Sequence, residues 1–299
     1  MLTKLEEVNN PLSATLLPSP PPYEYAITKI YLDKSNEPFS FQYIGLSIVA
    51  QYLLTHERVN VWININVGWG FNIVFSVLTV QNLSGGHLNP AISLLMYTFG
   101  ELELLHLFAY CVAQMLGAFL GAAATYYTYL DAINAYEKGP LNRTVVGATA
   151  TAAIFSTYPA SHLSMSGAYV DQIAGTAMLA LFACAIIDKR NKVPSCAHAV
   201  LFGFVVLLIG CTFGMNVGYP INPARDLAPR IFSYFIYGRQ VFTHPYPSWF
   251  LVPVIGPCVG AVVGGWMYHA FSGIHIPDEG EDKYQAVDQD ELKAKNAGV

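Results

Sequence analysis

Long apolar stretches alternate with short polar connections along most of the chain. Six of these stretches approach the roughly 20 apolar residues that a membrane-spanning helix needs. They cover residues 38–56, 61–81, 103–129, 167–187, 197–218 and 248–272. The pattern therefore predicts an all-α membrane protein with six transmembrane helices.

Two further apolar segments are too short to cross a membrane, and both open with the same tripeptide. The tripeptides are Asn89, Pro90 and Ala91 in "NPAISLLMYTFG", and Asn222, Pro223 and Ala224 in "NPARDLAPRIFSYF". Asparagine is a favourable N-cap, and proline is well placed at the first position of a helix. We therefore expect each segment to be a half-helix that begins at its asparagine.

The order span, span, half-helix, span occurs twice, which indicates an internal repeat. We assign the first repeat to about 38–135 and the second to about 160–272, within a channel domain of 38–272. Three spans separate the two half-helices, so the second repeat lies inverted in the membrane. Inverted repeats with broken helices place the working site near the midplane.

The segments outside this domain read as tails on the cytoplasmic side. Residues 1–37 are predicted to be a disordered N-terminal tail, and residues 273–299 an acidic tail. With both termini inside, Lys and Arg are more numerous in the cytoplasmic segments than outside, as expected of membrane proteins. The sequon that begins at Asn142 then faces outward, where a glycan can be attached.

Composition supports the membrane assignment and excludes other classes. Only 12% of the residues are charged, against about 25% in soluble domains. The net charge of −5 argues against a nucleic-acid partner. The sequence offers no nucleophile–base pair, metal-type cluster or phosphate loop, so we expect no enzyme activity, cofactor or metal.

A glycine-containing connection precedes each half-helix, "SGGHL" in the first repeat and "GMNVGYPI" in the second. Irregular backbone at membrane depth is tolerated only where it is buried in protein or lines a wet cavity. We therefore expect a pore lined by the carbonyl groups of Gly85, Gly86, His87, Asn216, Val217 and Gly218. The positive ends of two half-helices would repel cations there, and two asparagine amides would interrupt a chain of proton transfers.

The segments "SGGHLNPA" and "NPARDLAPR" closely resemble the signatures of the aquaporin superfamily, the major intrinsic proteins, and the resemblance covers roughly residues 45–272. It implies a homotetramer of six-helix bundles, each with its own pore, in a plasma membrane. It also places Arg225 at the narrowest constriction, where its fork of donors can hold a solute and its charge can repel cations. The alternative is that Arg225 forms a structural ion pair with Asp226.

The filter positions of this family fall on Trp69, Gly210, Tyr219 and Arg225. Water-selective members carry a histidine where this chain has Gly210. An aromatic corner of Trp69 and Tyr219 facing one arginine suits a small polyol, whose carbons lie on the rings while its hydroxyls take hydrogen bonds.

Further positions resemble the glycerol-conducting branch of the family. They are Tyr126, Asp226, Arg230, Pro253 and Val254. We therefore expect a passive channel for glycerol, water and other small neutral solutes that excludes protons and ions. The alternatives are a water-selective pore and a structural membrane protein with the same fold.

Two features depart from the family pattern or lie outside it. The family has a buried glutamate in the first and fourth spans, where this chain offers only Glu37 and the pair Asp171–Gln172. Either Gln172 supports its loop as a neutral amide or Asp171 takes that role. In the N-terminal tail, a Pro-Pro-x-Tyr pattern suits the aromatic grooves of WW domains, unless the tail is simply disordered. Its residues are Pro20, Pro21, Pro22 and Tyr23.

Overall fold

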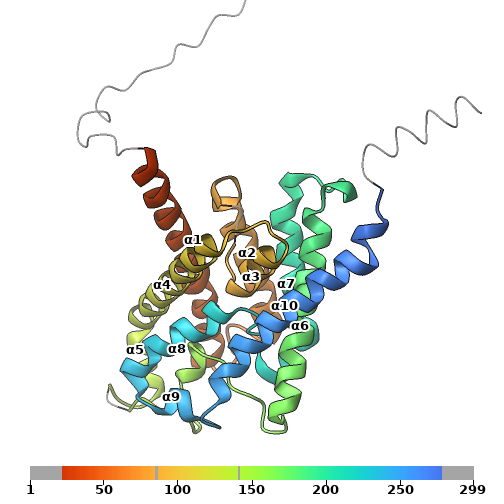
Figure 1. Cartoon of the computed structure of the whole chain (residues 1–299). Coiled ribbons are helices and arrows are strands. Elements are labelled where there is room, and N and C mark those ends of the chain that lie inside the picture. The colour runs from red at the N-terminus through yellow and green to blue at the C-terminus, as the bar shows by residue number, and fades with distance from the viewer. Residues whose placement is uncertain (1–21, 85–86, 141, 278–299) are drawn as a thin grey trace, which may run out of the picture.

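The computed structural model describes residues 22–84, 87–140 and 142–277. Within these ranges the chain consists of helices and loops, without strands, as the apolar pattern predicts. The long helices are α1 (Pro22–Leu54), α2 (Trp62–Ser84), α4 (Leu104–Thr128), α6 (Met165–Ile187), α7 (Ser195–Val217) and α10 (Val252–Phe271). The shorter ones are α3 (Pro90–Thr98), α5 (Leu130–Tyr136), α8 (Pro223–Tyr237) and α9 (Gln240–Thr243). Each predicted span corresponds to one long helix, and the two predicted half-helices are α3 and α8 (Figure 1).

The first helix begins much earlier than the sequence suggested. Helix α1 starts at Pro22 and continues through Pro38, so residues 22–37, which we assigned to the N-terminal tail, are helical. We placed the boundary at Pro38 because proline lacks an N–H and normally interrupts a helix. Pro20 and Pro21 of the Pro-Pro-x-Tyr pattern lie outside the described residues, and Pro22 and Tyr23 open α1.

By length and hydropathy alone, four helical segments of the described chain can cross a membrane. They are Leu104–Thr128, Met165–Ile187, Ser195–Val217 and Trp249–His275. Helices α1 and α2 are as long but carry more polar side chains, including Gln42, Asn66 and Asn72, which are all buried inside the bundle. These three side chains therefore serve contacts within the protein.

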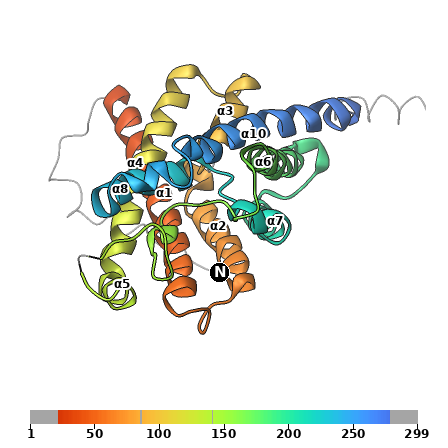
Figure 2. The ribbon, with the colours of Figure 1, turned by 90° about the horizontal axis from the view of Figure 1, so that it is seen from below.

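The packing of the helices repeats across the two halves. Helix α1 packs along α4 as α6 packs along α10, and α1 contacts α2 as α6 contacts α7. Half-helix α3 packs on α10, and half-helix α8 packs on α4. Helices α2 and α7 lie against each other where the halves meet (Figure 2). This exchange of partners is the arrangement expected of two inverted repeats.

Helices α2 and α7 approach closely at one pair of glycines. A Cβ atom on Gly203 would lie 2.6 Å from the carbonyl oxygen of Gly70, and a Cβ on Gly70 would lie 2.9 Å from the carbonyl oxygen of Gly203. Larger residues at either position would therefore push the two halves apart.

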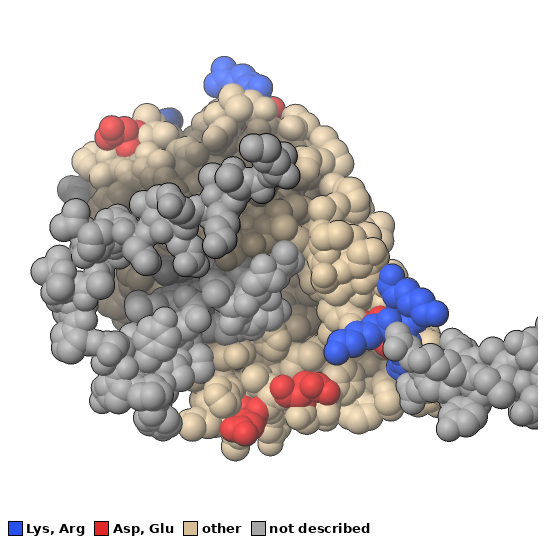
Figure 3. Space-filling model, turned by 90° about the horizontal axis from the view of Figure 1, so that it is seen from above, with Lys and Arg blue, Asp and Glu red and all other residues tan. Residues whose placement is uncertain are grey.

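The first and last described residues lie at the same end of the bundle (Figure 1). The connection between α6 and α7, which carries Lys189, Arg190 and Lys192, is at this end as well. Seen from there, the described surface is mostly uncharged, and its Lys and Arg side chains gather at the edge (Figure 3). The two ends of the described chain and this connection therefore lie on the same side of the bundle.

Candidate pore and selectivity filter

The two half-helices begin at their asparagines in the same way. The Oδ1 atom of Asn89 accepts from the N–H of Ala91 at 2.9 Å, and Oδ1 of Asn222 accepts from the N–H of Ala224 at 3.0 Å. Both asparagines have extended backbones, and a proline follows each as the first helical residue. The predicted N-caps are therefore present.

The same two side chains also join the half-helices to each other. The Nδ2 atom of Asn89 donates to the carbonyl of Ile221 at 2.8 Å, and Nδ2 of Asn222 donates to the carbonyl of Leu88 at 2.9 Å. Each asparagine thus binds the residue that precedes the other one. An amide nitrogen carries two hydrogens, so one N–H of each asparagine remains after this crossed pair has formed.

A cavity of about 150 Å³ runs past the crossed pair. Trp69, Tyr219 and Arg225 line one part of it, and Asn89 and Asn222 line another. The rest of its lining is mainly apolar and includes Val77, Ile92, Met96, Leu179, Ile187 and Val206. Predicted filter residues and half-helix starts therefore share one cavity.

Arg225 stacks on Trp69 inside this cavity. The guanidinium carbon lies 5.0 Å from the centre of the Trp69 ring, a distance at which an arginine is attracted to an aromatic face. Trp69 is 4% exposed and its ring fits against Gly45, where no Cβ could be accommodated. The glycine at position 45 therefore leaves room for the Trp69 ring beside the cavity.

The absence of a side chain at Gly210 leaves space that the Tyr219 ring and the Asn66 side chain occupy. A Cβ atom there would lie 2.6 Å from Oδ1 of Asn66 and 2.8 Å from Cζ of Tyr219. Gly210 itself is not among the residues that line the cavity. The sequence suggested that this glycine leaves open space in the filter, whereas the structure places the Tyr219 ring against it.

Arg225 keeps a hydrogen-bond donor for the cavity. Its Nη1 atom has no partner among the described residues. The neighbouring Asp226 pairs instead with Arg230, whose Nη2 lies 2.8 Å from the Asp226 carboxylate. A buried donor without a partner is costly, so a solute hydroxyl or water at this point would relieve that cost.

The second set of expected pore carbonyls needs correction. Helix α7 continues to Val217, so Asn216 and Val217 are helical, and the Asn216 carbonyl accepts from the N–H of Ala160 at 2.9 Å. The cavity is lined instead by the next three residues before Asn222, which are Tyr219, Pro220 and Ile221. The extended segment lies closer to the half-helix than we expected, because the helix does not stop at the first glycine.

In the first repeat, His87 lines the cavity as expected, while Gly85 and Gly86 lie outside the described residues. The His87 carbonyl accepts a hydrogen bond from Nε2 of Gln114. The backbone of this cavity-lining residue is therefore held by a side chain of α4.

The segment before Asn222 is strained. Gly218 has a φ of +79°, and the non-glycine residues Tyr219 and Ile221 have φ values of +40° and +39°. Such left-handed conformations cost non-glycine residues free energy and persist only where the surroundings hold them. For Ile221 the surroundings include Gln172, whose Oε1 accepts from its N–H at 3.1 Å.

Three buried amides support the pore, and the sequence indicated only one of them. Gln172 acts as a neutral amide, which is one of the two roles left open. Gln42 donates to the Arg225 carbonyl at 3.0 Å, and Gln114 binds both His87 and Ser93. A lone glutamine within an apolar run was the available signal for Gln42 and Gln114.

Asp226 and Arg230, two of the expected branch markers, hold the loop that precedes α6. Both side chains are fully buried. Asp226 accepts from the N–H and the hydroxyl of Thr157 at 2.7 and 2.6 Å, and Arg230 donates to the Thr157 carbonyl at 2.7 Å. Thr157 in turn is the residue that a Cβ on Gly218 would meet. The pair therefore ties half-helix α8 to the loop beside the filter.

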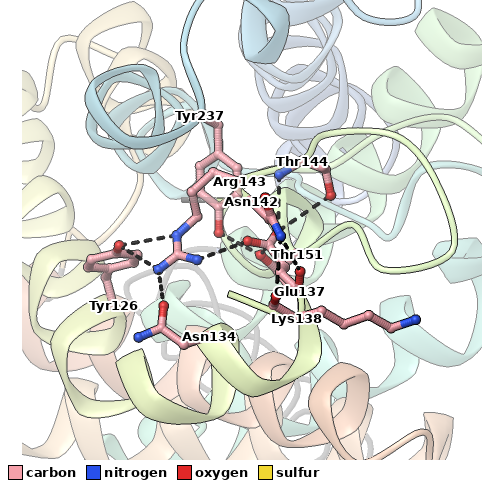
Figure 4. Close-up of polar contacts among 9 residues, drawn as sticks. All are labelled: Tyr126, Asn134, Glu137, Lys138, Asn142, Arg143, Thr144, Thr151 and Tyr237. Atoms are coloured by element: carbon pink, nitrogen blue, oxygen red, sulfur yellow. Dashed lines mark hydrogen bonds and ion pairs between the residues drawn. The ribbon is translucent and has the colours of Figure 1, made fainter. Parts of the chain in front are cut away.

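Tyr126, a third marker, holds the loop that follows α5. Its hydroxyl accepts from Nη2 of Arg143 at 3.0 Å, and Arg143 also pairs with the buried Glu137 (Figure 4). Asn142 of the sequon is exposed and donates only to backbone carbonyls. The last two markers, Pro253 and Val254, form the first turn of α10 and do not line the cavity.

Comparisons with known proteins agree with this geometry. A family model described as major intrinsic protein matches residues 38–268. Aquaporin-9 of Rattus norvegicus is 40% identical over 251 residues, covering 83% of this chain and 84% of that protein. Aquaporin-10 of Homo sapiens is 40% identical over 241 residues, covering 80% and 79%. An X-ray structure of the aquaglyceroporin from Plasmodium falciparum superposes with a TM-score of 0.71 at 28% identity, covering 81% of this chain and 95% of that one.

Proposed function

The chain belongs to the major intrinsic protein family, and we propose on this basis that it is a passive membrane channel for glycerol and water. It is an integral, multi-pass membrane protein. Its relatives include aquaporins 9 and 10 and a structure named as an aquaglyceroporin.

The proposal of glycerol as a solute rests on one observation, the chemistry of the cavity at Arg225. The guanidinium there stacks on Trp69 and keeps an unpartnered Nη1 donor, and the Tyr219 ring lines the same cavity. A polyol can place its carbons on the rings and accept a hydrogen bond from Arg225. Removing a solute hydroxyl from water without a new hydrogen bond costs about 2–7 kcal/mol. Each hydrogen bond to the pore replaces one lost to water and offsets this cost.

The crossed asparagines supply the exclusion of protons. Each has one amide N–H left after binding the opposite loop, and both lie at the start of a half-helix, where the backbone dipole is positive. A water that accepts from both turns its lone pairs toward them, so it cannot pass a proton along the file. The two helix starts and Arg225 also repel cations.

The decisive experiment is stopped-flow light scattering on liposomes that contain the purified protein. Under a glycerol gradient we expect fast shrinkage and then fast re-swelling, which empty liposomes lack. Fast shrinkage in an impermeant sugar without re-swelling in glycerol would identify a water-selective pore and contradict the proposed filter chemistry.

Assembly and location extend the proposal. We infer a homotetramer in the plasma membrane, with both termini in the cytoplasm and residues 38–272 as the channel domain. Helices α2 and α7 each expose apolar side chains, among them Phe71, Phe75, Phe204 and Leu208, which lipid or a neighbouring copy would cover. Light scattering coupled to size exclusion in detergent measures the number of chains.

A glycan on one loop and a partner domain at the N-terminal end belong to the same proposal. Asn142 is exposed, so we expect a glycan there, which a glycosidase-sensitive mass shift lost in Asn142→Gln would reveal. A WW domain would bind residues 20–23 only after the first turn of α1 unwinds, because Pro22 and Tyr23 open that helix. Binding of a WW domain to the full-length protein, lost in Tyr23→Ala, tests this contact.

A further inference from the structure

Helix α6 holds a buried acid that the proposed conduction mechanism does not use. Asp171 is 7% exposed and lies in the second turn of a helix long and apolar enough to cross a membrane. An ionisable side chain in such a place is costly and usually serves function. Asp171 neither lines the cavity nor forms an ion pair among the described residues.

The two carboxylate oxygens of Asp171 each accept one amide hydrogen bond. Oδ2 accepts from Nε2 of Gln172 at 2.9 Å, and Oδ1 accepts from Nδ2 of Asn216 at 2.7 Å. Asn216 lies in the last turn of α7, two residues before Gly218. The acid therefore reaches both the glutamine that supports the pore segment and the helix that leads into it.

Gln172, which binds Asp171, also binds the strained residue Ile221. The Ile221 N–H donates to Gln172 at 3.1 Å, and the Ile221 carbonyl accepts from Asn89 at 2.8 Å. Ile221 is thus held on both sides of its left-handed backbone, once from α6 and once from the opposite half of the molecule. Gln172 is fully buried, so water does not replace its bond to Ile221.

A glutamine amide alone does not fix which end faces Ile221. Its oxygen and nitrogen have nearly the same shape, and only the oxygen can accept the Ile221 N–H. A carboxylate accepts and never donates when ionised. Asp171 therefore draws the amide nitrogen toward itself and leaves the oxygen facing Ile221.

We propose that Asp171 is a positioning residue of the channel, which sets the orientation of the Gln172 amide and thereby holds the segment 219–221 in its pore-lining conformation. The inference rests on the proposed channel function. It assigns the negative charge to residue 171 and the neutral amide to residue 172. It therefore predicts what happens when the acid and the amide are swapped between these two positions.

The exchange follows from counting donors and acceptors. Gln172→Glu alone sets a second carboxylate against Asp171, so the two charges repel. Adding Asp171→Asn removes the conflict, because the new amide at position 171 can donate to the carboxylate at position 172 and still has an oxygen to accept from Asn216. The carboxylate at position 172 keeps an oxygen for the Ile221 N–H. Asp171→Leu removes the acceptor and frees Gln172 to turn.

The test compares wild type, D171L, Q172E, D171N/Q172E and the control D131L, whose aspartate is exposed on α5, in liposomes with equal amounts of folded protein. We expect D171L and Q172E to lower both water and glycerol permeability about tenfold, equivalent to about 1.4 kcal/mol. D131L should match wild type, and D171N/Q172E should recover most of the flux lost in Q172E. A D171N/Q172E protein that conducts no better than Q172E would overturn the proposal.

Hydrogen–deuterium exchange of the peptide that contains Ile221 gives a second readout that does not depend on flux. Its amide should exchange faster in D171L and Q172E than in wild type and should be protected again in D171N/Q172E. Equal exchange in all four proteins would overturn the proposal. Should wild type pass water but not glycerol, the glycerol assignment fails, while water flux and exchange still decide the role of Asp171.

Discussion

The guanidinium carbon of Arg225 lies 5.0 Å from the ring centre of Trp69. Trp69 belongs to the first repeat and Arg225 to the second. The contact gives a buried cation an aromatic face to rest on, without a carboxylate to neutralise it. A positive charge is thereby kept in the cavity together with an unpartnered Nη1 donor.

Replacing Arg225 with valine should make the pore leak. The loss of one buried positive charge should raise proton or cation leak about tenfold or more, equivalent to about 1.4 kcal/mol of electrostatic barrier. A pH-sensitive dye inside liposomes measures the leak under an imposed proton gradient. Arg239→Val, at an exposed arginine, is the control and should not leak. An equally tight R225V pore would show that Arg225 is not the barrier.

Replacing Gly210 with alanine should slow glycerol more than water. The new Cβ would overlap the Tyr219 ring, which lies 2.8 Å away, and would push it into the cavity at a cost of about 1–3 kcal/mol. Solute and water permeabilities measured by stopped flow give the ratio. In a Tyr219→Ala background the same substitution should change this ratio less, since the ring is gone and only the contact with Asn66 remains. An unchanged effect in that background would contradict the role given to Tyr219.

Breaking the buried pair Asp226–Arg230 should destabilise the protein. Asp226→Leu or Arg230→Met leaves one buried charge without its partner, which costs about 3–5 kcal/mol. The double variant D226L/R230M should lose less than the sum of the two single changes. Thermal unfolding in detergent measures the three variants, and simple additivity would argue against a coupled pair.

Asp188, just beyond the end of α6, should give a pH-dependent contribution to stability. Hydrogen bonds from Arg190 lower its pKa to about 2, below the value of about 3.9 in an unfolded chain. The ionised form is therefore favoured in the folded protein. Its stabilising effect is complete above pH 4 and is lost as the pH falls toward 2. The difference in melting temperature between wild type and D188N should be present at pH 7 and shrink below pH 4. A constant difference across this range would assign the effect to packing alone.

The helices and the half-helix starts were predictable because their signals are local. Apolar length identifies a span, and Asn-Pro-Ala encodes an N-cap followed by a first helical residue. The end of α7 was not predictable in this way. Gly214 reads as a turn residue, yet it lies inside the helix, where a Cβ would meet the ring of Trp62. The turn itself is made by Gly218, which has a positive φ.

The support of the pore was harder to foresee because its contacts cross the whole chain. Gln42 binds the carbonyl of Arg225, 183 residues away. The signal for Gln42 in the sequence, a glutamine within an apolar run, does not show which group the amide binds. Gln172 drew notice only through its place in the family pattern, and its partner Ile221 became evident once the strained loop was seen in three dimensions.

The crossed bonds of Asn89 and Asn222 also bear on how the protein is made. The acceptor for Asn89 lies 132 residues further along the chain, which takes on the order of ten seconds to synthesise. Throughout that interval the first half-helix has a cap of its own but no counterpart, and the Leu88 carbonyl awaits its donor. The crossed pair therefore forms only after the second half-helix has been made, so the first repeat by itself cannot complete the pore.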